Sequence, residues 1–128
     1  MNLGYVIIYV ADVPQTLSFY EKAFGIKQRF LHESNQYAEM ETGQTALAFA
    51  NENFVTFAQQ LRRNRTTEQS PGVEIAFVAD DVEKAFNHAI SAGATEVLKP
   101  TQKPWGQIVS YVRDLNGFLV EICSAIEV

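Results

Sequence analysis

The side chains that most often carry out catalysis are sparse in this sequence. Cys123 stands among apolar residues with no accompanying histidine or asparagine motif, which favours a buried, unreactive thiol over a nucleophile. His32 falls at the end of an expected strand and His88 within an expected helix, so the two histidines do not form a pair. We find no phosphate-binding glycine loop, no dinucleotide fingerprint and no zinc-type His/Cys spacing. These patterns argue against a cysteine nucleophile, a nucleotide cofactor and a His/Cys zinc site.

Trp105, the one tryptophan of the sequence, lies in a short loop between expected strands. Pro104 and Gly106 favour a tight loop that presents the ring just before an expected strand. Such a ring can stack on a flat or cationic ligand. The alternative is that Trp105 covers the core between two parts of the chain. The same two alternatives stay open for the aromatic residues Tyr37, Tyr111 and Phe57.

Length and composition restrict the class of protein. The 128 residues are 47% hydrophobic and include 15 acidic against 10 basic side chains, which suits one domain with a real core. A net charge of -5 argues against non-specific nucleic-acid binding. No apolar run approaches the ~20 residues that a membrane span needs. With one cysteine no internal disulfide can form. We therefore expect a cytoplasmic single-domain protein, residues 1–128, with no nucleic-acid or membrane partner.

Two stretches of the chain share one pattern. Residues 5–13 and 74–82 both show an apolar strand followed by Asp and Val, with Glu74 placed 69 positions after Tyr5. Both continue with apolar residues at helical spacing: Val13, Leu17, Tyr20 and Phe24 in the first, and Val82, Phe86, Ala89 and Ile90 in the second.

Residues with capping chemistry mark the ends of both expected helices. Asp12 and Asp80 are the expected N-caps, each followed three residues later by Gln or Glu. Gly25 and Gly93 follow the two helices, where a left-handed residue can close each one.

Three strand-like runs follow each helix. They cover residues 26–31, 36–41 and 45–50 in the first copy and 95–98, 107–112 and 118–123 in the second. The fold class is therefore α+β, with βαβββ modules at residues 3–50 and 73–124. A connector of low rigidity spans residues 51–72, with a short helix expected near Phe54–Leu61. The third strand of each module disfavours the alternative, a ferredoxin-like βαββαβ domain.

The order and spacing of several short motifs resemble the vicinal oxygen chelate superfamily, which contains glyoxalases, bleomycin-resistance proteins and extradiol dioxygenases. The resemblance covers essentially the whole chain. It implies the glyoxalase/bleomycin-resistance fold, in which two βαβββ modules form a curled mixed sheet with a cleft, usually in a homodimer. The motifs are Tyr9–Val13, Ser18–Tyr20, Phe24–Gly25, Pro104–Gly106 and Val112–Glu121.

The resemblance also implies four positions at which metal-dependent members hold a divalent ion. In this chain they fall at Tyr5, Ala48, Glu74 and Glu121, and the internal repeat likewise matches Tyr5 with Glu74 and Ala48 with Glu121. Alanine cannot ligate and tyrosine is a rare ligand, so two carboxylates remain where a catalytic zinc ion normally has three protein ligands. We therefore expect no metal and no cofactor, with a divalent metal at these residues as the alternative.

Strand alternation predicts which side chains share the cleft with these positions. Ala46, Ala48 and Ala50 would lie on one face together with Tyr5, Ile7 and Tyr9. Small residues beside bulky apolar ones leave volume for a small molecule. The predicted ligand-binding residues are Tyr5, Tyr9, Ala48, Trp105 and Tyr111, and the candidate catalytic residues are Glu74 and Glu121. Alternatively, the alanines pack against a partner strand or a dimer surface, and the carboxylates face water or pair with Arg113 and lysines.

Three functions remain open on this basis. The first is a homodimeric, metal-free protein that binds a small organic molecule. This ligand would be partly aromatic, and a cationic group in it would suit the acidic cleft. The second is an enzyme: a glyoxalase-type lyase or isomerase with an atypical metal site, or a metal-free catalyst with Glu74 and Glu121 as acid and base. The third is a regulatory module without a small ligand.

Overall fold

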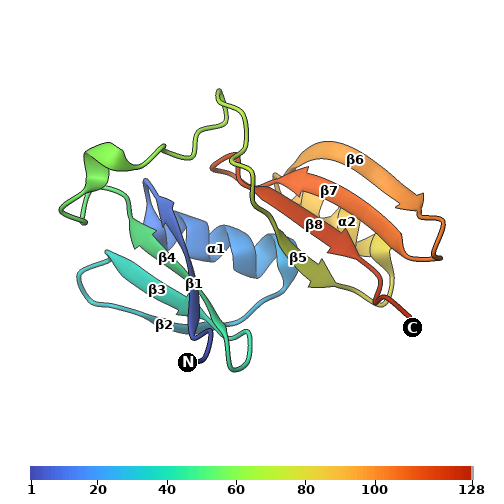
Figure 1. Ribbon diagram of the computed structural model, residues 1–128, viewed down its shortest axis with the longest axis horizontal. Helices are drawn as coiled ribbons and strands as arrows, with labels where there is room; N and C mark the ends of the chain where they lie inside the picture. Colours follow the sequence, from blue (N-terminus) through green and yellow to red (C-terminus); the bar gives the residue numbers. More distant parts are fainter. Residues whose placement is uncertain (128) are drawn as a thin grey trace. The chain divides into compact units, whose positions relative to one another are not determined.

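The computed structural model describes residues 1–127 and divides the chain into two compact units, Met1–Asn64 and Arg65–Val128. Within the described residues each unit has one α-helix and one four-stranded mixed sheet (Figure 1). The boundary between the units falls inside the predicted connector 51–72. Both units show the predicted βαβββ order, so the α+β fold class is confirmed. Because residues 46–51 form a strand, the ferredoxin-like alternative is wrong.

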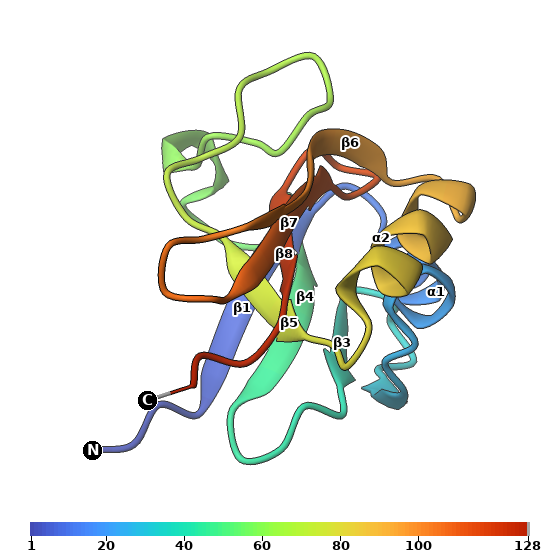
Figure 2. The same cartoon turned by 90° about the vertical axis from the view of Figure 1, so that its right-hand side faces the viewer.

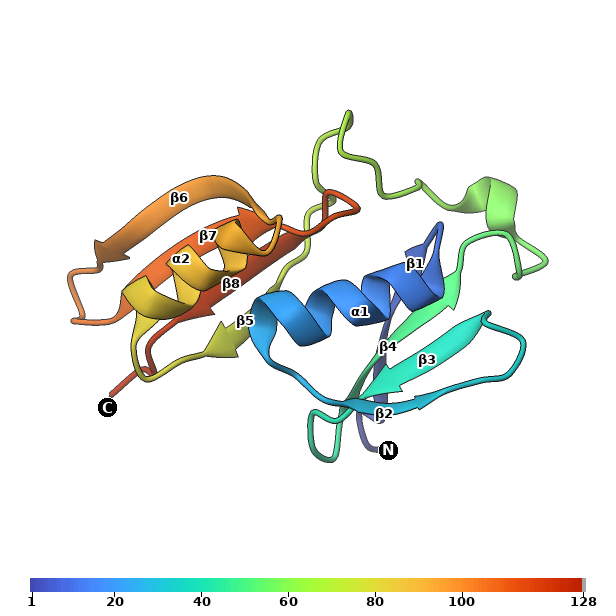
Figure 3. The ribbon, with the colours of Figure 1, turned by 180° about the vertical axis from the view of Figure 1, so that it is seen from behind.

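The first unit has the strand order β1-β4-β3-β2, with β1 parallel to β4 and the other neighbours antiparallel. Helix α1 lies along one face of this sheet (Figure 3). A 3-10 turn, Ala58–Gln60, stands where a short helix was expected. The elements are β1 (Tyr5–Val10), α1 (Val13–Phe24), β2 (Gln28–Leu31), β3 (Tyr37–Met40) and β4 (Ala46–Asn51).

The second unit repeats this arrangement with the strand order β5-β8-β7-β6. Strand β5 runs parallel to β8, and α2 covers one face of the sheet (Figure 2). The elements are β5 (Ile75–Val78), α2 (Val82–Ser91), β6 (Thr95–Gln102), β7 (Ile108–Arg113) and β8 (Leu119–Cys123). Across residues 1–127 no helix is long and apolar enough to span a membrane.

Each unit builds its core between its helix and its sheet. In the first unit Tyr20 of α1 and Phe49 of β4 are both fully buried, with ring centroids 4.8 Å apart. In the second unit Phe86 of α2 is buried, as are Val120 and Ile122 of β8. The apolar positions at helical spacing therefore mark the buried helix faces, and the opposite faces of both sheets are left for other roles.

The helix caps correct one prediction. Asp12 accepts a hydrogen bond from the Gln15 N–H at 3.0 Å, as expected. In α2, however, the cap is Asp81, which accepts from the Lys84 N–H at 3.0 Å, and the assignment to Asp80 is wrong by one residue. The spacing of 69 that matches Tyr5 with Glu74 also matches Asp12 with Asp81, so the internal repeat indicates Asp81 as the cap.

Strand β6 is longer than predicted. It continues from Thr95 to Gln102, through Pro100, instead of ending at Leu98. A proline removes a ladder hydrogen bond, which an edge strand tolerates, especially beside a bulge. β6 is an edge strand, and its register with β7 shifts between Leu98 and Thr101.

The connector is bonded more firmly than expected. Its first part is held to β1, because the Asn64 Nδ2 donates to the Tyr9 carbonyl at 3.0 Å. Its second part receives hydrogen bonds from Arg113, at the end of β7. Each end is thus fixed to its own unit, which differs from the low rigidity inferred from composition.

Candidate functional site

The candidate site residues lie on the sheet faces turned away from the helices. In β1, Ile8 and Val10 are buried, whereas Tyr5 is 57% exposed and Ile7 42% exposed. In β5 the exposed residues are Ala76 and Val78. The predicted alternation is therefore correct in both units.

A cluster of polar side chains occupies this face of the second unit. Glu121 of β8 stands opposite Ala76 of β5 and Tyr111 of β7. The Glu74 side chain, immediately before β5, lies beside the Glu121 carboxyl and interacts with it. The Tyr111 hydroxyl and the Cys123 thiol also lie beside the Glu121 carboxyl, and the thiol donates to the Phe77 carbonyl at 3.7 Å. The fold thus brings together Glu74, Glu121 and Tyr111, which the sequence predicted as site residues, with Cys123, which strand alternation placed on the face of Glu121 but which was expected only as a buried, unreactive thiol.

The surroundings shift the proton affinity of three of these groups. Burial, a hydrogen bond to Glu121 and the charge of Glu121 together raise the pKa of Glu74 to about 7. Burial, followed by contact with Glu121, raises the pKa of Tyr111 to about 12 and that of Cys123 to about 11. Near neutral pH the phenol and the thiol are therefore protonated, and the carboxyl pair binds a proton that it can readily lose.

This arrangement can act in two ways. A carboxyl whose pKa lies near neutrality can give and take protons at physiological pH. Once deprotonated, the Glu74–Glu121 pair places two negative charges side by side, and a cationic donor would relieve their repulsion. The same cluster can therefore bind a cation or exchange a proton.

The donor set does not fit a resident divalent ion. Glu74 and Glu121 lie beside each other, and within residues 1–127 no histidine joins them in a metal-binding group. Throughout residues 1–127, no three His, Cys, Asp or Glu side chains come together as a metal site requires. The other two family positions, Tyr5 and Ala48, lie in the first unit, and Ala48 has no side-chain donor.

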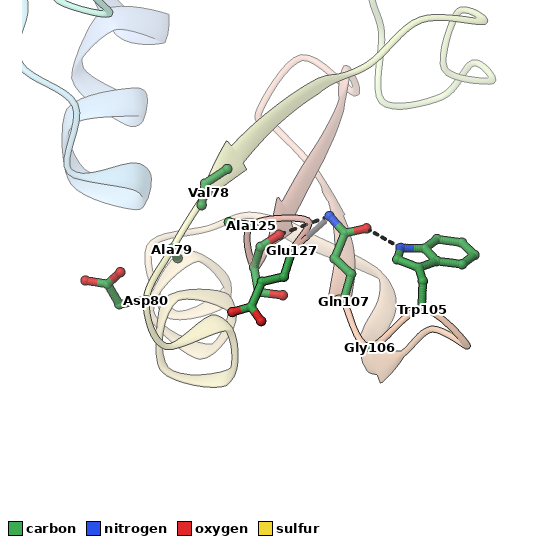
Figure 4. A pocket seen from close by; sticks show the side chains of 9 residues that line it. Val78, Ala79, Asp80, Trp105, Gly106, Gln107, Ala125 and Glu127 are labelled. Carbon is green, nitrogen blue, oxygen red and sulfur yellow. Dashed lines mark hydrogen bonds between the residues drawn. The ribbon is translucent and has the colours of Figure 1, made fainter.

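Trp105 stands beside a cavity of about 340 Å³ at one end of the second sheet (Figure 4). Its indole N–H donates to the Gln107 Oε1 at 3.0 Å, and the Gln107 Nε2 donates to the Ser124 carbonyl at 3.0 Å. The residue is 59% exposed, which favours ligand stacking over a role in covering a core. The described lining consists of Val78, Ala79, Asp80, Trp105, Gly106, Gln107, Ser124, Ala125 and Glu127.

Gln107 connects this cavity with the carboxyl cluster. Besides its bonds to Trp105 and Ser124, its side chain hydrogen-bonds to Cys123, which in turn contacts Glu121. Polar side chains therefore follow one face of β7 and β8 from the cavity to the pair. Sequence reasoning missed Gln107, although it precedes Tyr111 by four residues and strand alternation places both on one face.

The predicted residues of the first unit have different surroundings. Tyr5 is exposed, while Tyr9 is half-buried and its carbonyl accepts the Asn64 amide. Ala48 is fully buried between Ile7 and Glu39 in the strand register. It was expected to leave room for a ligand, but in this environment a larger side chain would overpack the site.

Glu39 is an acidic residue of the same sheet face that sequence reasoning missed. It accepts a hydrogen bond from the Tyr37 hydroxyl at 2.8 Å and lies 3.4 Å from an Arg29 nitrogen. Burial, followed by the contact with Glu39, raises the pKa of Tyr37. Arg29 also contacts Glu41 at 2.7 Å. Alternation from Tyr37 would have placed Glu39 on this face, but its partners depend on cross-strand register.

The chain is similar to known proteins over nearly its whole length. A family model described as a glyoxalase-like domain matches residues 3–127. A glyoxalase/bleomycin resistance protein/dioxygenase family enzyme from Burkholderia phytofirmans PsJN is similar at 23% identity, covering 97% of this chain and 98% of that one, with a TM-score of 0.78. A glyoxalase-related enzyme from Fulvimarina pelagi is 16% identical, with coverage of 98% and 88% and a TM-score of 0.80.

TioX from Micromonospora sp. ML1 is a further similar structure, at 20% identity, with coverage of 97% and 98% and a TM-score of 0.74. At these identities the three structures share the fold with this chain. No curated protein matches the chain in sequence.

Proposed function

Because the chain belongs to the glyoxalase-like domain family, within the vicinal oxygen chelate superfamily, we propose that it binds a small organic cation with a flat aromatic part and holds no resident metal. The binding site is the sheet face of the second unit that runs from Trp105 to the Glu74–Glu121 pair. The observation that carries this proposal is the proximity of the two carboxyls, which within residues 1–127 belong to no group of side chains that could hold a metal.

The chemistry of the pair supports a cationic ligand. Two adjacent carboxylates repel each other, and a bound cation that donates hydrogen bonds to both relieves this repulsion. Tyr111 and Cys123 already lie beside Glu121, so the ligand completes a cluster that is partly organised in advance. A planar amidinium or guanidinium group suits such a pair because it presents parallel N–H donors.

The cavity beside Trp105 supports an aromatic part in the ligand. An exposed indole held by Gln107 offers a flat surface of fixed orientation, and a cation or an aromatic ring can stack on it. Asp80 and Glu127 in the cavity lining add negative charge.

The test uses benzamidine, a flat aromatic cation, with benzoate as a control of similar shape and opposite charge. Isothermal titration should detect binding of benzamidine and not of benzoate. Glu121→Gln should weaken benzamidine binding by about tenfold, the typical size of a lost charge-assisted hydrogen bond. Glu96→Gln, which removes a charge from an exposed position of β6, is the matched control and should leave the affinity unchanged.

Two results would overturn this proposal. One is equal binding of benzamidine and benzoate. The other is a stoichiometric transition metal in the purified protein that disappears in Glu121→Ala. Native mass spectrometry of freshly purified protein gives a further check, since a tightly held natural ligand should appear as added mass.

Acid–base catalysis is a second candidate, favoured by the pKa of about 7 at Glu74. A lyase or isomerase without metal would use Glu74 and Glu121 to remove and return a proton next to a carbonyl. Deuterium exchange into dihydroxyacetone in heavy water, followed by NMR, tests this activity. Exchange that Glu121→Gln abolishes would establish it, and exchange at the buffer rate would exclude it for this probe.

We extend the proposal to a homodimer. One face of the first sheet exposes the apolar side chains of Tyr5 and Ile7, and exposed apolar side chains on one face favour self-association. Light scattering at micromolar concentration should give twice the 14.4 kDa mass of one chain. A mass near one chain would contradict the dimer.

A further inference from the structure

Arg113, the last residue of β7, forms hydrogen bonds to a series of backbone carbonyls. Its Nε donates to the Gly117 oxygen at 2.9 Å, and its Nη1 donates to Thr66 at 3.2 Å. Its Nη2 donates to the oxygens of Arg65 at 3.1 Å and Glu68 at 2.6 Å. One side chain thus joins the β7–β8 turn to three carbonyls of the connector.

The β7–β8 turn packs closely against connector residue Arg65. Gly117 has φ of 89°, and a Cβ there would lie 2.5 Å from the Arg113 Nη2 and 2.6 Å from the Arg65 oxygen. The Ser70 hydroxyl donates to the Gly117 carbonyl at 2.8 Å. The connector therefore approaches the turn too closely for any side chain at position 117, and bonds on both sides of that contact hold it.

The connector segment that Arg113 and the turn hold leads directly to Glu74. Ser70 precedes Glu74 by four residues, and β5 begins directly after Glu74. The other members of the cluster come from the hairpin to which the connector is attached, since Tyr111 is on β7 and Glu121 on β8. The same contacts thus fix the connector, which leads to Glu74, against the hairpin that carries Glu121.

We propose that Arg113 is a positioning residue for the Glu74–Glu121 pair: by bonding the connector to the β7–β8 turn, it sets the Glu74 carboxyl against that of Glu121. An arginine suits this role because its planar group offers five N–H donors, which can serve several carbonyls at once. Residues 65, 66 and 68 lie outside helix and strand, so no helix or strand ladder supplies donors for their carbonyls, although the Arg65 oxygen also accepts the Glu68 N–H at 3.2 Å. The ligand-affinity part of the test rests on the proposed function, whereas the structural part does not.

The test compares Arg113→Met, which keeps the length of the side chain but removes every donor, with Arg113→Lys, which keeps the charge but has fewer donors. Amide hydrogen exchange should become at least about tenfold faster at Glu68 in Arg113→Met, because its N–H belongs to the connector turn that Arg113 holds. The pKa of Glu74, followed by carboxyl-carbon NMR, should fall toward its ordinary value as Glu74 leaves Glu121. In Arg113→Lys, both the increase in exchange at Glu68 and the fall in the pKa of Glu74 should be smaller than in Arg113→Met.

Arg29→Met is the matched control, because Arg29 is also an arginine with several partners but lies in the first unit. It should change neither the exchange at Glu68 nor the titration of Glu74. Ser70→Ala, a milder change to the same attachment, should shift both readouts in the direction of Arg113→Met and decides the question if that variant does not fold.

The benzamidine affinity separates this inference from the proposed function. If Arg113→Met lowers the affinity about tenfold together with the pKa of Glu74, both are supported. If benzamidine fails to bind the unaltered protein, the proposed function falls, while the exchange and the titration still decide the role of Arg113. Faster connector exchange with an unchanged Glu74 titration would overturn the positioning role, and so would unchanged exchange.

Discussion

Benzamidine binding should weaken as the pH falls from 8 to 6. The Glu74 carboxyl contacts Glu121, and its pKa is raised to about 7 by burial and by that contact. Benzamidine keeps its positive charge across this range. The cation and the proton therefore compete for the same pair of carboxyls, and binding of one drives off the other.

The size of the effect follows from this single titration. With a pKa of about 7, roughly nine-tenths of the sites are deprotonated at pH 8 and roughly one-tenth at pH 6. If benzamidine binds the deprotonated pair alone, its affinity falls about tenfold over these two pH units. Glu74 remains exposed as a residue, so water moderates the contact and tenfold is an upper bound.

Isothermal titration at pH 6, 7 and 8, repeated in two buffers of different ionisation enthalpy, measures both the affinity and the protons released. Proton release should be near one per ligand at pH 6 and should fall toward zero at pH 8. Burial remains in Glu121→Gln, but the neighbouring charge that helps to raise the pKa of Glu74 is lost, so the pH dependence should shift to lower pH. Equal affinities at pH 6 and pH 8, or an unchanged profile in Glu121→Gln, would refute the reasoning.

Three further predictions concern stability, measured as the free energy of unfolding in urea. Gly117→Ala should cost at least ~1 kcal/mol more than Gly43→Ala: both glycines have positive φ, but at Gly43 an added Cβ meets nothing within 4 Å; equal costs would contradict the close approach at Gly117. Asp81→Ala should cost ~1 kcal/mol and Asp80→Ala much less, since Asp81 caps α2; the reverse order would restore the original cap assignment. Phe49→Ala should cost about 3–5 kcal/mol because its ring is fully buried, and a loss below ~1 kcal/mol would exclude that packing.

The fold was predictable because its signals are local and occur twice. Helical periodicity, the Gly25 cap and the turn at residues 114–117 each depend on neighbours in sequence. The errors have causes of another kind. Strand β6 passes through Pro100 because it lies at the edge of the sheet, and strand order cannot be obtained from a local pattern. The prediction of Asp80 as the cap of α2 was wrong because Asp80 and Asp81 are adjacent and both can cap a helix, so that only the repeat spacing of 69 distinguishes them.

The candidate site was predictable in part for a similar reason. The internal repeat and the family resemblance indicated Glu74 and Glu121, and the fold places the two carboxyls together. Gln107 was not predicted, because its contact with Cys123 depends on which residues face each other across β7 and β8. A single sequence gives alternation along one strand but not the register between two strands.

The register also shows how the two halves of the repeat differ in chemistry. In the first sheet Ala48 stands opposite Glu39, and in the second Glu121 stands opposite Tyr111. Glu39 has a cation beside it, because Arg29 lies 3.4 Å away.

The second sheet uses its arginine differently. Arg113 follows Tyr111 by two residues on the same strand, but its guanidinium donates to backbone carbonyls of the connector and the turn. Burial, together with the contact and the charge of Glu121, therefore raises the pKa of Glu74, and that arginine does not offset the charge. For this reason we assign the cation-binding role to the second sheet, where a ligand can supply the positive charge that Arg29 supplies within the first.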